Sequence, residues 1–172
     1  MTQLQIKSFT VEANGIINVL ISKVHISPPR NPTAGTGLEL GPDCKEFEAI
    51  WDTGASGTVI TEKVVKDCGL KPHGVTDVHT AKGKMRSNTY LVDVWLPNHV
   101  TIADVIVTLG ELTDNKDVLV GMNIVNAGDF AVSNYLGKTV FTYRFPSMER
   151  IDFVQKPFKI KTPLRIPTRR MK

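Results

Sequence analysis

One carboxylate stands out among the residues of this chain that could do chemistry. Asp52 lies between an apolar run and a turn-forming stretch in AIWDTGASGTVIT, residues 49–61. The hydroxyl groups of Thr53 and Ser56 can hydrogen-bond to an ionised carboxylate, and Gly54 lets the backbone approach a ligand or another chain closely. A lone carboxylate activates water poorly, because it has no acid partner at neutral pH. Two carboxylates in contact share one proton and so provide a base and an acid in one site.

The stretch around Asp52 resembles the apolar-apolar-Asp-Thr-Gly-Ala/Ser signature of aspartic proteases, in particular the single-domain, retropepsin-like enzymes and their bacterial relatives. Downstream, VLVGMNIV (residues 118–125) resembles the apolar-apolar-Gly segment that packs behind the active-site loop of that family. Between them, HTAKGKMRSNTYLVDVWLP (residues 79–97) lies where the family carries its flap, a Gly-tipped hairpin that closes over the substrate. The resemblance covers residues 47–153.

The resemblance implies a site shared between two chains. Two-lobed aspartic proteases carry two aspartate loops, whereas this sequence has one Asp-Thr/Ser-Gly. The implied enzyme is therefore a homodimer, an aspartic endopeptidase in which each subunit supplies one carboxylate of a dyad that polarises the attacking water. The implied catalytic residues are Asp52, Thr53 and Gly54. The implied substrate-contacting or supporting residues are Ala55, Ser56, Ala81, Lys82, Gly83, Lys84, Leu119, Val120 and Gly121.

Three features depart from the retroviral pattern. Ser56 stands where the retroviral enzymes usually carry a second aspartate, and Met122 stands where they have arginine. The usual ion pair between those two positions is therefore missing. The expected flap is unusually basic, with Lys82, Lys84 and Arg86, which hints at acidic residues near the cleaved bond.

Strand signals dominate the rest of the chain, because apolar residues alternate with polar ones between short turns. Residues 4–26 indicate two strands that form a hairpin at Asn14-Gly15, a dipeptide typical of tight turns. A short helix is expected in residues 61–70, with Thr61 as the residue that caps its start and Gly69 at its end. Further strands and hairpins are expected in residues 45–51, 75–97 (tip near Gly83), 100–110, 117–128 (broken at Gly121, with helical turns ending at Gly128) and 129–145 (turn near Leu136-Gly137).

These elements predict an all-β fold, mostly strand with one or two short helices. The resemblance implies a closed retropepsin-like (acid-protease) barrel, a single lobe that forms a homodimer. We expect one domain over residues 1–153, with a Pro- and Gly-rich surface loop at 27–43, and then a basic, Pro-containing tail at 154–172. A chain of 172 residues, 41% of them hydrophobic, can bury a core of this size.

The sequence also predicts where the protein works. No apolar stretch approaches membrane-spanning length, and the N-terminal residues lack the apolar core of a signal peptide. Cys44 and Cys68 are too few for a disulfide framework, so we expect reduced thiols and a cytoplasmic protein. Their spacing from His73 and His79 matches no usual zinc site, and no metal or cofactor is expected.

Other interpretations stay open. Asp-Thr-Gly is also good turn chemistry, and the fold could serve a dimeric binding module that cleaves nothing, because a fold does not fix a function. The tail of residues 156–172 carries seven basic residues and no acidic one, which would suit phosphates. Phe158 is its one aromatic residue, so it offers no stacking platform. The expected partners are therefore a peptide or protein substrate and a second copy of the chain, with no membrane. Nucleic-acid binding is not expected, and it stays open as a third interpretation that rests on the basic tail alone.

Overall fold

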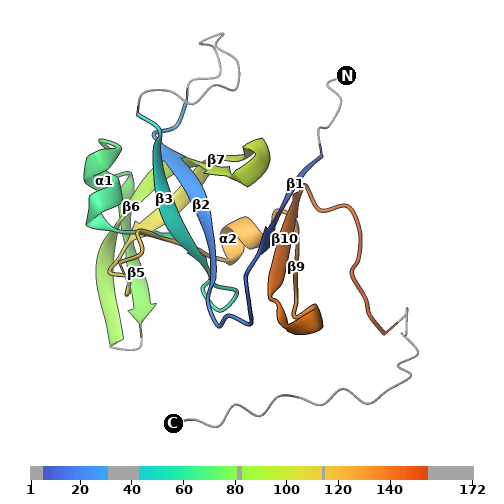
Figure 1. Ribbon diagram of the computed structural model, residues 1–172. Helices are drawn as coiled ribbons and strands as arrows, with labels where there is room; N and C mark the ends of the chain where they lie inside the picture. The colour runs from blue at the N-terminus through green and yellow to red at the C-terminus, as the bar shows by residue number, and fades with distance from the viewer. Residues whose placement is uncertain (1–5, 31–42, 81–82, 114, 155–172) are drawn as a thin grey trace.

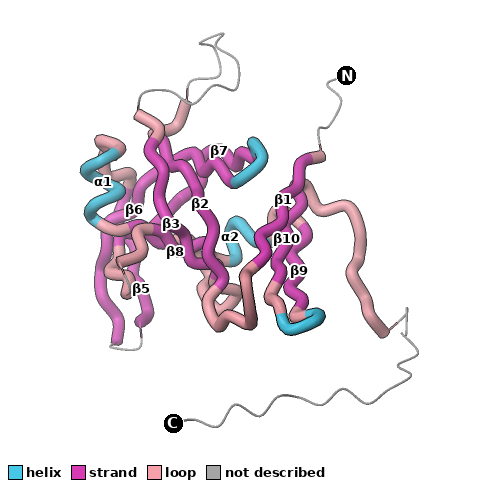
Figure 2. Tube along the Cα trace, in the orientation of Figure 1, coloured by secondary structure: helices cyan, strands magenta, loops and turns pink. Residues whose placement is uncertain are grey.

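The computed structural model describes residues 6–30, 43–80, 83–113 and 115–154 (Figure 1). Strands dominate these residues (Figure 2), and neither of their helices is long and apolar enough to cross a membrane. In chain order the elements are β1 (Lys7–Glu12), β2 (Leu20–Ser27), β3 (Lys45–Trp51), β4 (Val59–Ile60), α1 (Glu62–Asp67), β5 (Gly74–Thr80), β6 (Gly83–Leu96), η1 (Pro97–His99), β7 (Val100–Leu109), β8 (Val118–Val120), α2 (Met122–Val125), β9 (Asp129–Ser133), η2 (Tyr135–Gly137) and β10 (Val140–Phe145).

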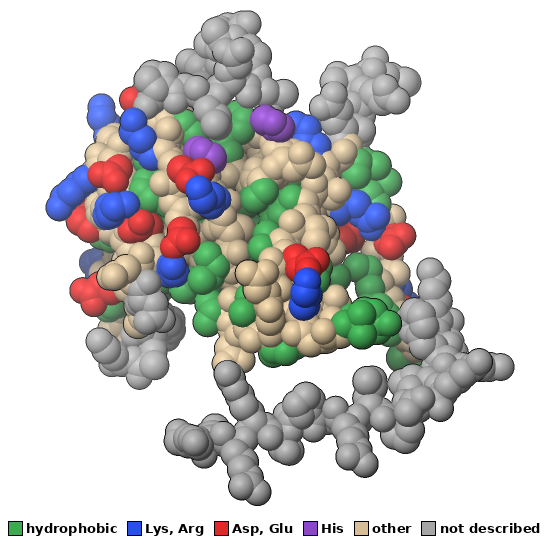
Figure 3. All heavy atoms as spheres, viewed as in Figure 1, with side chains coloured by type: hydrophobic (Ala, Val, Ile, Leu, Met, Phe, Trp, Pro, Cys, Tyr) green, Lys and Arg blue, Asp and Glu red, His purple; other side chains and the backbone are tan. Residues whose placement is uncertain are grey.

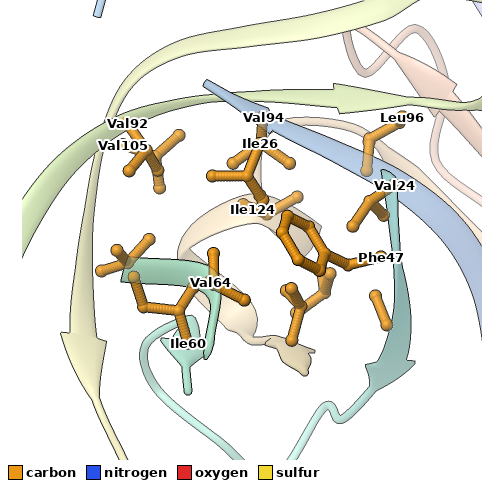
Figure 4. Close-up of a cluster of buried hydrophobic side chains, with 14 of the residues drawn as sticks. Val24, Ile26, Phe47, Ile60, Val64, Val92, Val94, Leu96, Val105 and Ile124 are labelled. Carbon is orange, nitrogen blue, oxygen red and sulfur yellow. The ribbon is translucent and has the colours of Figure 1, made fainter. Parts of the chain in front are cut away.

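The larger sheet closes into a barrel. Its strand order is β2-β3-β8-β4-β7-β6-β5, and β2 also pairs with β6, so six strands form a ring and β5 extends from β6 as a hairpin. Because side chains alternate between the two faces of a strand, every second residue points into the barrel. Figure 4 shows the resulting core, which includes Val24, Ile26, Phe47, Ile60, Val64, Val92, Val94, Leu96, Val105 and Ile124.

A second, three-stranded sheet has the order β1-β10-β9 and packs beside the barrel through aromatic rings. Trp51, the last residue of β3, stacks on Phe130 of β9 with the ring centroids 5.4 Å apart. Its indole Nε1 donates a hydrogen bond to Ser22 Oγ at 2.9 Å. Phe9 and Tyr143 contact the same indole ring. These contacts fix the position of the residue that immediately precedes Asp52.

The hairpin predicted at Asn14-Gly15 is wrong, although both of its strands exist. β1 pairs with β10, and β2 pairs with β3 and β6, so the two strands belong to different sheets. The physical reason is the burial of Phe9, which packs against Phe141 and Tyr143. That aromatic contact outweighs a local turn preference. Residues 13–19 instead cross from one sheet to the other.

The other predicted elements are confirmed. β3 occupies residues 45–51, and α1 follows Thr61 and ends before Gly69, whose φ is 59°. The Thr61 side chain makes no capping hydrogen bond, because its hydroxyl donates to Asp117 Oδ1 at 3.3 Å instead. The β5–β6 and β9–β10 hairpins are antiparallel, and the latter turns at Leu136-Gly137. Most of the predicted loop at residues 27–43 lies outside the described residues. Cys44 and Cys68 are free thiols.

Asp129, at the start of β9, should make the stability of the fold depend on pH in acid. Hydrogen bonds from the Ser147 hydroxyl, the Met148 N–H and the Arg144 guanidinium hold the pKa of this carboxyl well below its ordinary value of 3.8. An aspartate whose pKa is lowered by folding stabilises the fold above its unfolded-state pKa, and this stabilisation is lost as pH falls toward the folded-state pKa. The urea midpoint of Asp129→Asn should therefore lie below that of wild type above about pH 5 and approach it by about pH 2.

The control for this comparison is Asp67→Asn. Asp67 is exposed on α1 and forms a surface ion pair with Lys63, so its replacement should change the midpoint little at any pH. A gap between wild type and Asp129→Asn that stays constant down to about pH 2 would contradict the assignment.

Candidate active site

Asp52 follows β3 directly, and its own turn holds it in place. Its backbone N–H donates to Val120 O at 3.0 Å, and its carbonyl accepts the N–H of Ala55 at 3.3 Å. The carboxylate oxygen Oδ1 accepts the N–H of Gly54 at 2.8 Å. The side chain is partly exposed. The result is a fixed carboxylate that faces outward at the end of a buried strand.

The turn after Asp52 is built from small residues because the backbone passes close to the carboxylate. A Cβ atom on residue 54 would lie 3.1 Å from Asp52 Oδ1, so glycine suits this position. Thr53 and Ser56 are exposed, and Ala55 is partly buried. The side chains of Thr53 and Ser56 are therefore accessible to a substrate or to another chain.

The segment from β8 into α2 supports this turn from behind. Strand β8 runs parallel to β3, which places Leu119 beside Ile50 and Val120 beside Trp51. The N–H of Met122 donates to Ala55 O at 2.8 Å. The structure therefore brings residues 52–56 together with residues 119–121. Val120 and Gly121 are buried, so they support the turn, whereas Leu119 is partly exposed.

Two supporting residues, Thr58 and Asn123, were not identified from the sequence. The Thr58 hydroxyl is fully buried, donates to Asn123 Oδ1 at 2.8 Å and accepts the N–H of Gly121 at 3.2 Å. The N–H of Asn123 donates to Ser56 O at 3.2 Å. A hydroxyl among small and apolar residues, as in Gly57-Thr58-Val59, was the available signal. The hydrogen-bond partner of Thr58, Asn123, lies 65 residues further along the chain, so the local sequence could not predict this contact.

Removal of the Thr58 hydroxyl should destabilise the protein. Thr58→Val keeps the shape but leaves the buried Gly121 N–H without its partner, at a cost of about 1–3 kcal/mol in the free energy of unfolding. Thr58→Ser keeps both hydrogen bonds and loses one buried methyl group, at about 1 kcal/mol. Urea denaturation of the two variants measures the difference. A Thr58→Val variant as stable as wild type would show that the hydroxyl contributes nothing.

The predicted flap forms the β5–β6 hairpin. Figure 1 shows the two described strands of this hairpin at the edge of the barrel, on the same side as the turn that follows β3. Gly83, with φ of 120°, begins β6. Lys84 forms an ion pair with Asp77 at 2.9 Å, which neutralises part of the basic charge expected there. Ala81 and Lys82 lie outside the described residues.

The described part of the chain contains no cluster of three or more His, Cys, Asp or Glu side chains that could hold a metal ion. Cys68 is buried with its thiol against Ile26 O, and burial raises its pKa to about 11. Such a thiol is a poor nucleophile at neutral pH.

The closed barrel, the supported Asp-Thr-Gly turn and the sequence agree on one class of protein. Residues 38–124, half of the chain, match the sequence profile of the family described as aspartyl protease. The chain belongs to this family, and its fold is the single-lobed, retropepsin-like form. No curated protein matches the sequence.

Several solved structures align with the chain at low identity. A retropepsin-like aspartic protease from Rickettsia conorii is 14% identical, with 84% of this chain and 99% of that chain covered and a TM-score of 0.49. The protease of simian foamy virus (mac) is 17% identical, with coverages of 62% and 91% and a TM-score of 0.40. The retroviral protease-like domain of Ddi1 from Leishmania major is 13% identical, with coverages of 63% and 78% and a TM-score of 0.37.

Proposed function

We propose that this chain is an aspartic endopeptidase whose active site forms between two copies, each of which contributes Asp52. The observation that carries the proposal is the Asp52 turn itself. Its partly exposed carboxylate is held by the N–H of Gly54 and backed by β8 and α2, in a member of the aspartyl protease family. The described chain presents one such turn, so a second carboxylate has to come from another copy.

In the dimer, the two Asp52 carboxyl groups share one proton. The ionised group takes a proton from a water molecule, and the water oxygen attacks the peptide carbonyl carbon. The protonated group gives its proton to the carbonyl oxygen. When the tetrahedral intermediate collapses, the carboxyl group that is now protonated gives its proton to the amide nitrogen, the ionised carboxylate takes a proton from one hydroxyl of the intermediate, and the C–N bond breaks, which restores the singly protonated dyad. Positioned acid and base groups of this kind contribute roughly 10² to 10⁴ in rate.

The neighbouring residues have supporting roles in this proposal. Thr53, exposed beside Asp52, would hydrogen-bond across the dimer and lock the two turns together. Gly54 and Ser56 would contact the substrate main chain. Leu119 would border an apolar subsite. The β5–β6 hairpin would close over the bound peptide and exclude water.

Two properties of the activity test this proposal. Specific activity toward a diverse peptide mixture should fall on dilution, because dissociation separates the two halves of the site. Activity should also fall at both ends of a scan from about pH 4 to 8 or beyond. At low pH the fully protonated dyad has no base, and at high pH the fully ionised dyad has no acid. Concentration-independent cleavage by a monomer would contradict the shared site. A stable dimer that cleaves no peptide would favour the binding module.

Several expectations stay predictions. They are the cytoplasmic location, a peptide or protein as the substrate, the absence of a nucleic-acid partner and the boundary between the domain and the tail. Residues 155–172 of that tail lie outside the described residues.

A further inference from the structure

The two cysteines of the chain meet at one point where β2 pairs with β3. The buried thiol of Cys68 donates a hydrogen bond to Ile26 O at 3.3 Å. Ile26 of β2 pairs with Lys45, the first residue of β3, and Cys44 directly precedes Lys45. The Lys45 N–H lies within hydrogen-bond reach of the same Cys68 sulfur. The sulfur of Cys68 therefore lies beside the peptide unit that joins Cys44 to Lys45.

The electrostatics of the two thiols also indicate that they are neighbours. Burial, and then the negative charge of an ionised Cys44, raise the pKa of the Cys68 thiol to about 11. Such a charge effect requires the two groups to be near one another. A disulfide joins cysteines whose Cα atoms lie within about 7 Å. Because Cys44 Cα is two bonds from the Lys45 nitrogen, rotation of the two side chains can bring the sulfurs together.

The two thiols differ in accessibility. Both are free, but Cys44 is partly exposed whereas Cys68 is only 3% exposed. A reagent in solution therefore meets Cys44 first. Cys68 can react only with a group that is already beside it, and the proximity of Cys44 compensates for the weak nucleophilicity of the buried thiol.

The surrounding surface favours a bond within one chain over a bond between copies. Figure 3 shows Lys and Arg side chains interspersed with Asp and Glu over the α1 and β3 side of the molecule. The ion pairs Lys23–Glu46 and Lys66–Glu62 belong to this surface. Because the centres of protein interfaces are depleted in charge, a second copy is not expected to place its own cysteine here.

We propose that Cys44 and Cys68 are a redox modification site, at which hydrogen peroxide converts the two thiols into an intrachain disulfide. The Cys44 sulfur, as the thiolate, attacks one peroxide oxygen, the O–O bond breaks, and a Cys44 sulfenic acid and one water form. The Cys68 sulfur then attacks the Cys44 sulfur. The S–O bond breaks, and the leaving hydroxide takes the Cys68 proton to become a second water. Two electrons pass from the thiols to the peroxide.

The disulfide would close residues 44–68 into a loop that contains β3, the Asp52 turn and α1. A cross-link of this kind stabilises a fold mainly by restricting the unfolded chain. Cys44 precedes β3 and Asp52 follows it, so the bond would lie at the opposite end of the strand from the Asp52 carboxylate. Oxidation should therefore stabilise the fold and leave the geometry of the Asp52 turn unchanged.

Peroxide treatment of the full wild-type chain tests the proposal. After free thiols are blocked, a non-reducing peptide map by mass spectrometry should show one linked peptide that contains residues 44 and 68. The thermal midpoint of the oxidised protein should rise by about 10 °C. Dithiothreitol should remove both the linked peptide and the rise in the midpoint.

Two variants test the order of the reaction. In Cys68→Ser, which keeps a donor for Ile26 O, Cys44 should stop at the sulfenic acid, which dimedone labels. In Cys44→Ser, the same dose of peroxide should leave Cys68 unmodified, because its thiol is buried. Neither variant should show the rise in the midpoint. The peptide map of the wild type stands even if a variant fails to fold.

Two results would overturn the proposal. One is a wild-type protein in which peroxide oxidises Cys44 to the sulfinic acid while Cys68 stays a free thiol. The other is a disulfide that forms only between chains. Neither measurement uses peptide cleavage, so failure here leaves the proposed protease activity standing, and failure of that activity leaves this modification site standing.

Discussion

Replacement of Asp52 by asparagine should lower kcat/KM for peptide hydrolysis by about 10²- to 10⁴-fold, because the dyad loses both the base and the shared proton. The fold should persist. Asparagine has nearly the same size, and its amide oxygen can accept the Gly54 N–H that now donates to Oδ1 at 2.8 Å. Steady-state cleavage of a peptide substrate gives the loss of activity, and thermal unfolding checks the fold.

Asp67→Asn is the matched control for this loss. Asp67 lies on α1 and is exposed, and its ion pair with Lys63 is a surface contact. This variant should cleave peptides at the wild-type rate. Retention of more than about a tenth of the activity by Asp52→Asn would exclude the carboxylate from the chemistry.

Replacement of Gly121 by alanine should both destabilise the protein and impair activity. The added Cβ would lie 2.4 Å from Gly57 O, 2.5 Å from Gly57 C and 3.0 Å from Ala55 O. These are backbone atoms of the Asp52 loop, so no side-chain rotation can relieve the overlap. We expect a loss of about 2–4 kcal/mol in the free energy of unfolding. We also expect about a 100-fold loss of activity, because a shift of roughly 1 Å in a catalytic group has that effect.

Gly57→Ala provides the steric control for the unfolding measurement. A Cβ at residue 57 would meet nothing within 4 Å, so its free energy of unfolding should change by less than about 1 kcal/mol. Equal destabilisation by the two substitutions in urea titrations would contradict the steric account of Gly121.

The sequence predicted most reliably the elements whose structure depends on a short local segment of the chain. The strand before Asp52, the helix after Thr61 and the break at Gly121 follow from local patterns, and the structure has all three. The hairpins β5–β6 and β9–β10 were also predictable, because a glycine marks each turn and the paired strands are neighbours in sequence.

Contacts between distant segments could not be predicted in this way. β1 pairs with β10 because Phe9 is buried against Phe141 and Tyr143, far along the chain. The hydrogen bond from Thr58 to Asn123 spans 65 residues. Counting basic residues in the flap also gave no indication that Lys84 is paired with Asp77. Each of these depends on where the barrel brings side chains together.

Mixing wild type with Asp52→Asn tests the central claim, a site shared between two copies, most directly. Total protein is held constant well above the dimer dissociation constant, subunits are allowed to exchange, and cleavage is measured against the wild-type fraction. A mixed dimer has one carboxylate and should be inactive, so activity should follow the square of that fraction, with about a quarter remaining in an equal mixture. A linear dependence, with about half remaining, would show that each chain acts alone and would contradict the account.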